Sequence, residues 1–262
     1  MKVGWIDFLN TLPFDFGITG VKPDVNIELV KGRPSDINRL IRENKIDIGF
    51  ISSAEYIQNF DKYLIFPDLS ISALNKVHSV AIFSNVPVED ISTVYLTKAS
   101  KTSRFLTFVV FKEIWKKDVE FRELEDTKDI EKKSVLLIGD NAIEFKDRFS
   151  YVYDLSAVWY RETKLPFVFA LWCVREEFYQ KNKQKVNLFY NTLKLSKEKF
   201  FKNPEFFVEK SDKDIDKGFS VRYLKSLDYC LSEEHMKSLN MFSSYLKKLG
   251  LIDKTPLFRF IK

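Results

Sequence analysis

The sequence has few of the residues on which disulfide frameworks, metal sites and acid–base catalysis usually depend. Among its 262 residues there are two cysteines, Cys173 and Cys230, and two histidines. Two cysteines so far apart, in dissimilar settings, indicate neither a disulfide framework nor a zinc site. Cys173 lies in an apolar run and Cys230 follows Leu227 at helical spacing, so both are predicted to be buried core thiols. No metal site is expected.

Long hydrophobic stretches are also missing. The longest apolar run spans residues 167–174, whereas a helix that crosses a bilayer needs about 20 residues. The N-terminal stretch reaches an acidic side chain at Asp7, before the roughly 7–15 apolar residues that a secretory signal requires. We therefore expect a soluble cytoplasmic protein that has no membrane partner.

The motifs of several large enzyme classes do not occur. The sequence contains no glycine-rich dinucleotide loop, no P-loop, no Gly-x-Ser-x-Gly and no His-Glu-x-x-His. Charge is not concentrated either, because 42 Lys and Arg against 37 Asp and Glu leave a net charge of +5 spread along the chain. Nucleic-acid binders usually carry a basic stripe or arm, so no nucleic-acid partner is expected. The mild positive charge is compatible with an anionic small molecule.

The chain does contain a repeated alternation of strand-like segments and amphipathic helices, and its 45% hydrophobic residues suffice for an ordinary core. Ser35 and Ser52 are predicted to cap helices, the latter in a capping box with Glu55. From Glu176 onward the pattern is helical and rich in lysine. The alternation indicates two α/β lobes with mostly parallel sheets, followed by helices. The expected strands lie at residues 3–6, 25–30, 46–51, 80–83, 94–96, 119–124, 134–138 and 167–174.

Small polar residues lie at the ends of five of the predicted strands. They are Asn10 and Thr11, Ser52 and Ser53, Ser79, Thr102 and Ser103, and Gly139, Asp140 and Asn141. In open α/β sheets, ligands bind outside the carboxyl ends of strands, where a following helix presents free N–H groups and the positive end of its dipole. Each group alone is more simply a helix cap, but together they favour a cleft for a carboxylated small molecule. Asp140 would repel an anion, so we expect it to cap its helix, orient a donor or accept from a substrate hydroxyl.

The two histidines differ in their settings. His235 ends the sequence Ser-Glu-Glu-His at the expected start of a solvated helix, which predicts a surface position. His78 directly precedes Ser79 at the start of an apolar strand. Both a site residue and a structural histidine fit that position, so its role stays open.

Four motifs resemble those of the chorismate dehydratases of the futalosine route to menaquinone. The motifs are FLNTLPF (8–14), IDIGFISSAEY (46–56), LLIGDNA (136–142) and YDLSAVW (153–159), the last continuing to TKLPFVFALW (163–172). They occur in order over roughly two-thirds of the chain, and the lysine-rich tail adds little. In two places the sequence departs from the family pattern. Phe8 stands where the family usually has Tyr, and Lys76 stands in the stretch before Ser79 where Gly is common.

The resemblance implies a fold like that of the type II periplasmic binding proteins, with two α/β lobes, two crossover strands and a cleft between the lobes. The first lobe would comprise residues 1–86 and 170–262, including the C-terminal helices, and the second lobe residues 87–169. The crossovers would lie at 84–88 and 167–174.

The resemblance also implies a reaction. The family removes water from chorismate, giving 3-[(1-carboxyvinyl)oxy]benzoate, with no metal or organic cofactor. The substrate's own side-chain carboxylate is the expected base. Asn10 would orient the reacting centre, and Ser79 would bind substrate or assist loss of the hydroxyl. Thr102 and Ser103 would hold a carboxylate, and the remaining small polar residues would line the cleft: Ser52, Ser53, Gly139, Asp140 and Asn141.

Two alternatives stay open beside this hypothesis. The first is a pure binding protein for a small anion. The second is the sister enzyme that forms 1,4-dihydroxy-6-naphthoate from cyclic dehypoxanthine futalosine, for which His78 is the one histidine with a suitable position. The sequence does not decide whether the protein forms a homodimer.

Overall fold

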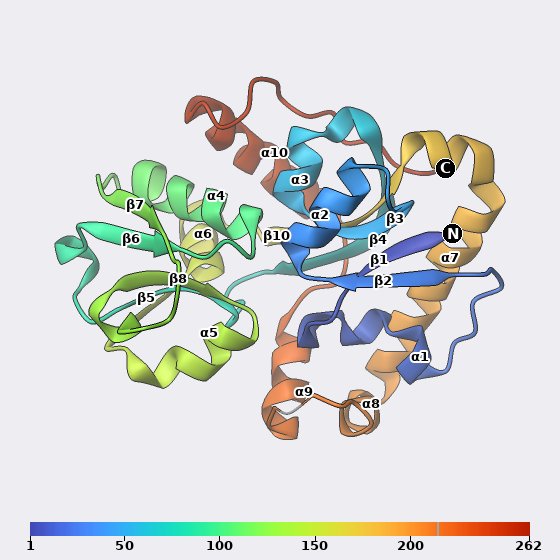
Figure 1. Cartoon of the computed structure of the whole chain (residues 1–262), viewed down its shortest axis with the longest axis horizontal. Coiled ribbons are helices and arrows are strands. Elements are labelled where there is room, and N and C mark those ends of the chain that lie inside the picture. Colours follow the sequence, from blue (N-terminus) through green and yellow to red (C-terminus); the bar gives the residue numbers. More distant parts are fainter. Residues whose placement is uncertain (214) are drawn as a thin grey trace.

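Two five-stranded sheets form two lobes that lie side by side (Figure 1). The computed structural model describes residues 1–213 and 215–262. The strand order is β2-β1-β3-β10-β4 in the first sheet and β7-β6-β8-β5-β9 in the second. The strands of the first sheet are β1 (Lys2–Ile6), β2 (Glu28–Gly32), β3 (Ile48–Ser52), β4 (Tyr63–Ala73) and β10 (Phe167–Arg175). Those of the second are β5 (Val80–Ser84), β6 (Thr93–Leu96), β7 (Glu120–Glu123), β8 (Ser134–Ile138) and β9 (Tyr151–Asp154).

Helices cover the faces and ends of these sheets. The α-helices are α1 (Phe16–Thr19), α2 (Pro34–Arg42), α3 (Ser53–Gln58), α4 (Lys101–Val109), α5 (Asp140–Phe145), α6 (Leu155–Thr163), α7 (Glu176–Lys202), α8 (Pro204–Glu209), α9 (Lys217–Ser226) and α10 (Glu233–Lys248). Short helical turns complete them: η1 (Leu9–Phe14), η2 (Phe60–Lys62), η3 (Val88–Asp90), η4 (Val110–Ile114), η5 (Ile130–Lys132) and η6 (Lys146–Arg148). The predicted cap at Ser35 is wrong, because α2 begins at Pro34 with Arg33 as its N-cap. Ser52 does cap α3, where its hydroxyl accepts from the N–H of Glu55.

Both sheets are mixed rather than mostly parallel. β1 runs parallel to β2 and β3, whereas β10 is antiparallel to β3 and β4. In the second sheet, β5 is antiparallel to β8 and β9. The chain leaves the first lobe through β4 and returns through β10, so these two strands must run in opposite directions. The same reasoning applies to β5 and β9, through which the chain enters and leaves the second lobe.

The first passage between the lobes lies earlier than expected. The eleven-residue strand β4 is absent from the sequence-based expectation, because Pro67 and Asp68, at φ +59°, interrupt its apolar pattern. The expected crossover at 84–88 is wrong. Ser84 ends β5 inside the second sheet, with its hydroxyl 2.9 Å from that of Ser134. Residues 74–79 therefore make the first passage, before the expected lobe limit at residue 86. The expected return segment, 167–174, is a strand, β10, of the first sheet, and residues 164–166 precede it.

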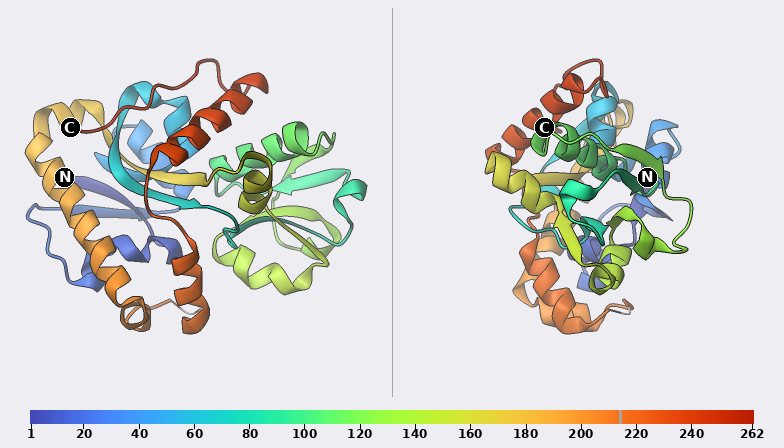
Figure 2. Two further views of the ribbon diagram at one scale, coloured as in Figure 1. Left: turned by 180° about the vertical axis from the view of Figure 1, so that it is seen from behind. Right: turned by 90° about the vertical axis from the view of Figure 1, so that its left-hand side faces the viewer.

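An aromatic core holds the first lobe together. Trp172 on β10 contacts Trp5, Phe14 and Phe50, with ring centroids 5.1–5.9 Å apart. Phe189 on α7 packs on the same indole at 5.8 Å. Helix α7 thus lies across the back of the first sheet, as expected for the C-terminal helices (Figure 2). Helix α10 contacts both β10 and α4, so it touches both lobes.

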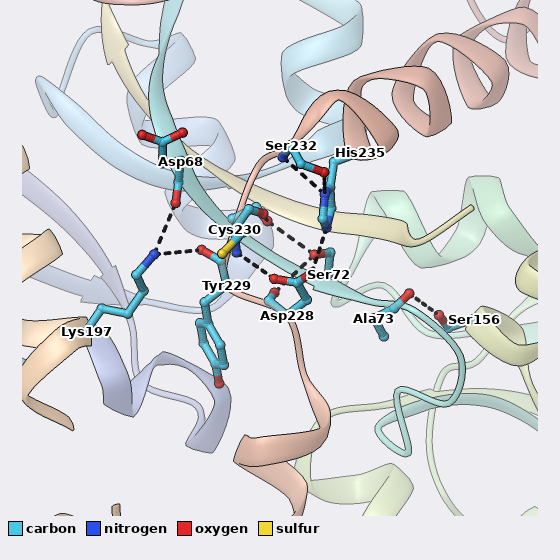
Figure 3. Close-up of polar contacts among 11 residues, drawn as sticks. Asp68, Ser72, Ala73, Ser156, Lys197, Asp228, Tyr229, Cys230, Ser232 and His235 are labelled. Carbon is cyan, nitrogen blue, oxygen red and sulfur yellow. Dashed lines mark hydrogen bonds and ion pairs between the residues drawn. The ribbon is translucent and has the colours of Figure 1, made fainter. Parts of the chain in front are cut away.

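The segment between α9 and α10 is hydrogen-bonded to β4 (Figure 3). The backbones of Ser72 and Asp228 exchange two hydrogen bonds of 2.8 Å each. The N–H of Ser70 donates to the carbonyl of Tyr229 at 3.3 Å, and Lys197 on α7 donates to the same carbonyl at 3.4 Å. This segment is therefore an extended strip fixed to the crossover strand.

Two predictions for this strip and the start of α10 are wrong. His235 is buried, with 3% of its surface exposed. Its Nδ1 accepts from the N–H of Ser232 at 3.2 Å, and its Nε2 lies 3.2 Å from the carboxylate of Asp228. Cys230 is exposed, because the strip is extended and not helical as its spacing from Leu227 had indicated. Cys173 is buried, as predicted.

Candidate functional site

A cavity of about 70 Å³ lies where the two lobes meet. Residues of both lobes form its wall, and most of the wall is apolar or aromatic. The lining residues are Ile6, Phe8, Asn10, Thr11, Pro34, Phe50, Ser52, Ile71, Val77, Ser79, Val80, Ser100, Ser103, Ile138, Gly139, Phe169 and Ala170. Small-molecule sites usually have volumes of about 300–1,000 Å³, so the lobes are nearly closed over this one.

Each of the five predicted groups of small polar residues contributes to this wall. The contributing residues are Asn10, Thr11, Ser52, Ser79, Ser103 and Gly139. They come from the carboxyl-end side of strands in both sheets, because each follows β1, β3, β4, β6 or β8 in the chain. This agrees with the rule that open α/β sheets bind ligands at this edge.

The hydrogen bonds of Ser52 leave its hydroxyl hydrogen free to be donated into the cavity. Its oxygen accepts from the amide of Asn38 at 2.9 Å and from the N–H of Glu55 at 3.3 Å. A serine hydroxyl has two acceptor sites and one donor hydrogen. With both acceptor sites occupied, Ser52 is a donor toward whatever fills the cavity.

Ser100 and Ser103 form a similar pair at the start of α4. The oxygen of Ser100 accepts from both the N–H and the hydroxyl of Ser103, at 3.2 and 3.0 Å. The hydroxyl hydrogen of Ser100 is then directed toward the cavity by the same count of donors and acceptors. Because the N-terminus of a helix favours negative charge, this corner of the cavity suits a carboxylate.

Ser79 has a partner from the far end of the sequence. The phenol of Tyr223, on α9, donates to the Ser79 oxygen at 2.8 Å. Tyr223 is buried, and this burial raises its pKa well above the ordinary value despite hydrogen bonds with Ser79 and Asn10. The neighbouring Tyr229 donates its own phenol hydrogen to the backbone carbonyl of Asn10 at 3.0 Å.

Ser53 and Thr102 do not line the cavity, although both were predicted to contact substrate. Their hydroxyls lie 3.3 Å apart across the lobe interface, and the Thr102 oxygen also accepts from the N–H of Ala54 at 2.9 Å. Both side chains are fully buried. The two hydroxyls hydrogen-bond to each other, and that of Thr102 also accepts from Ala54. Both side chains therefore connect the lobes instead of facing a ligand.

Asp140 and Asn141 also lie outside the wall. They occupy the first turn of α5, with exposed side chains. Although Asp140 reaches solvent, the protein around its carboxylate removes part of its hydration and raises its pKa, an effect that Lys213 opposes and Asp7 reinforces. Gly139 alone of this group reaches the cavity. Its φ of +60° suits glycine, and an added Cβ there would lie 3.6 Å from the ring of Phe8.

His78 points away from the cavity. Its side chain is exposed and is not part of the wall. Its backbone, at φ +60°, donates to Asp154 at 2.7 Å, and Val77 donates to the same oxygen at 3.0 Å. Asp154 thereby fixes the passage between the lobes directly before Ser79. Burial raises the pKa of Asp154 against these backbone hydrogen bonds.

Within the described part of the chain, the wall of this cavity carries no Asp, Glu, Lys, Arg or His side chain. Its polar groups are hydroxyls, one side-chain amide and backbone. The sequence-based reasoning missed Ser100, which its position as the cap of α4 could have indicated. It also missed Tyr223, which no local pattern indicates.

Comparisons with known proteins agree with this geometry. The sequence model of a family described as menaquinone biosynthesis matches residues 1–248. A chorismate dehydratase of Thermus thermophilus is 32% identical over 166 residues, which cover 55% of this chain and 60% of that protein. A chorismate dehydratase of Campylobacter jejuni is 28% identical over 271 aligned positions, covering 100% of this chain and 96% of that protein.

Solved structures show the fold. A protein from Archaeoglobus fulgidus superposes with a TM-score of 0.77 at 17% identity, covering 96% of this chain and 98% of that chain. The periplasmic aliphatic sulphonate binding protein of Escherichia coli superposes with a TM-score of 0.71 at 12% identity, covering 98% and 94%. The expected α/β fold of the periplasmic-binding-protein type is therefore confirmed. No helix among the described residues has the length and apolar character needed to cross a bilayer.

Proposed function

The chain belongs to the menaquinone biosynthesis family, and from this we propose that it dehydrates chorismate to 3-[(1-carboxyvinyl)oxy]benzoate, the first step of the futalosine route. The two relatives that bear the name chorismate dehydratase support the proposal. One structural observation gives the proposed activity its strongest support. Among the residues that the structure describes, the cavity between the lobes offers several hydrogen-bond donors but no charged side chain.

This donor set suits a reaction whose driving force lies in the substrate. Loss of water makes the ring aromatic, so the protein need only hold a dianion in one pose and stabilise the departing hydroxyl. The substrate's side-chain carboxylate takes the ring proton, and the electrons of that C–H bond form the new ring double bond. The C–O bond on the same ring breaks. The departing hydroxyl takes up the proton that the carboxylate removed from the ring, and it leaves as water.

Individual roles follow from the positions in the wall. Asn10 orients the reacting centre, and Ser79 donates to the departing hydroxyl. Ser52 and Ser100 donate to the substrate carboxylates, and Ser103 holds the Ser100 oxygen through its own N–H and hydroxyl. The hydroxyls of Ser53 and Thr102 are reassigned to the contact between the lobes, and Asp140 and Asn141 are not part of the proposal.

The sister-enzyme alternative has less support. That activity is expected to use a histidine base in the cleft, and His78 has its side chain outside the cavity wall. The binding-protein alternative shares the fold, so only the fate of the ligand separates it from the dehydratase. A cytoplasmic location and the homodimer remain predictions.

In the deciding experiment, purified protein is incubated with chorismate in the presence of EDTA. We expect chorismate absorbance to fall and the carboxyvinyloxy-benzoate to appear by mass spectrometry. Chorismate that is bound but unchanged at high protein concentration would favour the binding protein. Conversion of cyclic dehypoxanthine futalosine instead would favour the sister enzyme.

A further inference from the structure

We propose that Tyr223 is a positioning residue that holds the Ser79 hydroxyl as a hydrogen-bond donor to the departing hydroxyl of the substrate. This inference rests on the proposed function. It assigns to the C-terminal part of the chain a role in the site that the sequence motifs, which end near residue 175, do not indicate.

The hydroxyls of Tyr223 and Ser79 lie within hydrogen-bond distance, and both residues are buried. The Tyr223 oxygen lies 2.8 Å from the Ser79 oxygen and is the donor. The exposed fractions of Tyr223 and Ser79 are 3% and 2%. A buried hydrogen bond of this length has a defined direction, since no water competes for either group.

The number of donor and acceptor sites on Ser79 shows what its hydrogen bond with Tyr223 does. Ser79 has one hydrogen to donate, and Tyr223 occupies one of its two acceptor sites. The Ser79 hydrogen is directed to the carbonyl of Val77 at 3.3 Å, which is long for an O–H···O bond. A departing hydroxyl in the cavity offers a better acceptor. Ser79 can therefore turn its hydrogen to the substrate while Tyr223 continues to hold the oxygen.

Tyr223 acts through its neutral form. Burial raises its pKa, although the hydrogen bonds with Ser79 and Asn10 oppose the rise. A phenol that stays protonated is a constant donor, and it exchanges no proton with the substrate. We therefore expect no new ionisation in the pH profile from this residue.

The placement of Tyr223 is fixed from both sides. Helix α9 is followed directly by the strip that pairs with β4 through Ser72 and Asp228. Tyr229 in that strip holds the backbone of Asn10. One C-terminal segment thus contacts both residues that are proposed to act on the reacting centre, and it does so across the passage between the lobes.

The test is a double-mutant cycle with chorismate as substrate. Tyr223→Phe keeps the ring and removes the donor, so we expect kcat to fall about tenfold, the effect of one lost hydrogen bond of ordinary strength. KM should change less than about twofold, because Tyr223 does not touch the substrate. In a Ser79→Ala background, Tyr223→Phe should cause a much smaller loss than in the parent, since Tyr223 acts chiefly through Ser79 and keeps only its contact with Asn10.

The matched control is Tyr179→Phe. Tyr179 is equally buried, at 3% exposed, and its phenol donates to the carbonyl of Lys262 at 2.6 Å, away from the cavity. It should keep the parent kcat. Thermal unfolding of each variant checks the fold. Should Tyr223→Phe not fold, Tyr223→Gln and Tyr223→Met replace it, and the glutamine variant, which has a donor, should be the faster.

The outcomes separate this inference from the proposed function. If the parent protein does not convert chorismate, the proposed function fails. If the parent converts it and Tyr223→Phe keeps the parent kcat, the positioning role is overturned. Losses that multiply in the double variant would overturn it as well, since they would mean that Tyr223 acts independently of Ser79. Equal rates for the glutamine and methionine variants would do the same.

Discussion

At the scale of single residues, the candidate site depends on neutral groups whose directions are set by their neighbours. Ser52 is held by Asn38, Ser79 by Tyr223, and the Ser100 oxygen accepts twice from Ser103. Such preorganised donors stabilise negative charge without a cost of reorientation during the reaction. Because the described cavity wall has no charged side chain, these neutral donors would have to bind the substrate carboxylates by themselves.

Asn10 provides the most direct test of that arrangement. Replacing Asn10 with Ala removes the only side-chain amide that the described residues contribute to the wall. We expect kcat for chorismate to fall by about 10² or more, as for other lost donors at a reacting centre. Steady-state kinetics measure the effect, with circular dichroism as the check on folding. A rate within twofold of the parent would remove Asn10 from the site.

At the scale of elements, the helices that begin at the interface do more for the contact between lobes than for the ligand. Helix α3 of the first lobe and α4 of the second meet at Ser53 and Thr102. The Thr102 oxygen accepts the N–H of Ala54, so a backbone group of one lobe is satisfied by a side chain of the other.

Thr102→Val should therefore destabilise the protein. The variant leaves the buried N–H of Ala54 without an acceptor, at a cost of about 1–3 kcal/mol. Thermal or denaturant unfolding measures the loss. Thr107→Val on the same helix is the control, because Thr107 donates to the helical carbonyl of Ser103 and leaves no unpaired N–H behind. Equal losses in the two variants would contradict the role of the interlobe contact.

The strip before α10 should show a defined pH dependence. The hydrogen bond with His235 lowers the pKa of Asp228, although partial burial opposes the shift. A carboxylate whose pKa is lower in the folded state stabilises the fold at pH values above its ordinary pKa of about 4. That contribution disappears as the pH falls through the lowered folded-state value.

The parent should thus lose more unfolding free energy than Asp228→Asn between pH 6 and pH 3. Urea denaturation at the two pH values measures the difference. Asp253→Asn, at an exposed position near the C-terminus, should behave like the parent. If Asp228→Asn loses as much stability on acidification as the parent does, the hydrogen bond with His235 contributes nothing to the fold.

At the scale of the whole molecule, the two lobes form the site only together. The cavity of about 70 Å³ is small beside the roughly 300–1,000 Å³ of most small-molecule sites. Two backbone passages, at residues 74–79 and 164–166, connect the sheets. We therefore expect the lobes to part to admit the substrate and to close again to bring Ser52, Ser79 and Ser100 to it.

Small-angle scattering tests this motion. The free protein in solution should have a larger radius of gyration than the protein saturated with the carboxyvinyloxy-benzoate product. An unchanged radius under conditions where calorimetry shows binding would contradict a lobe motion.

Much of the fold followed from local patterns. The apolar run at 134–138 coincides with β8, and the runs at 80–83 and 94–96 fall within one residue of β5 and β6. These segments are short, apolar and bounded by turn residues, so their own sequence determines them. The polar residues after the strands could be assigned to one cavity for the same reason, because parallel strands end at a common edge.

Other features depend on contacts between distant parts of the chain. β4 escaped prediction because Pro67 and Asp68 divide it, and only pairing with β10 and with Phe260 near the C-terminus makes it one strand. His235 has the neighbours of a solvated residue in sequence but is buried by contact with Asp228. Periodicity describes one element at a time and carries no information about its partners.

What the sequence by itself determined is which residues are candidates for the site: short polar side chains placed at strand ends, in motifs typical of one family. What only the tertiary structure decided is which of them face a ligand. Ser52 and Ser103 reach the cavity, whereas their neighbours Ser53 and Thr102 join the lobes. The direction of a hydroxyl is set by the groups around it, and Tyr223, 144 residues from Ser79, reaches its oxygen only once the chain has folded.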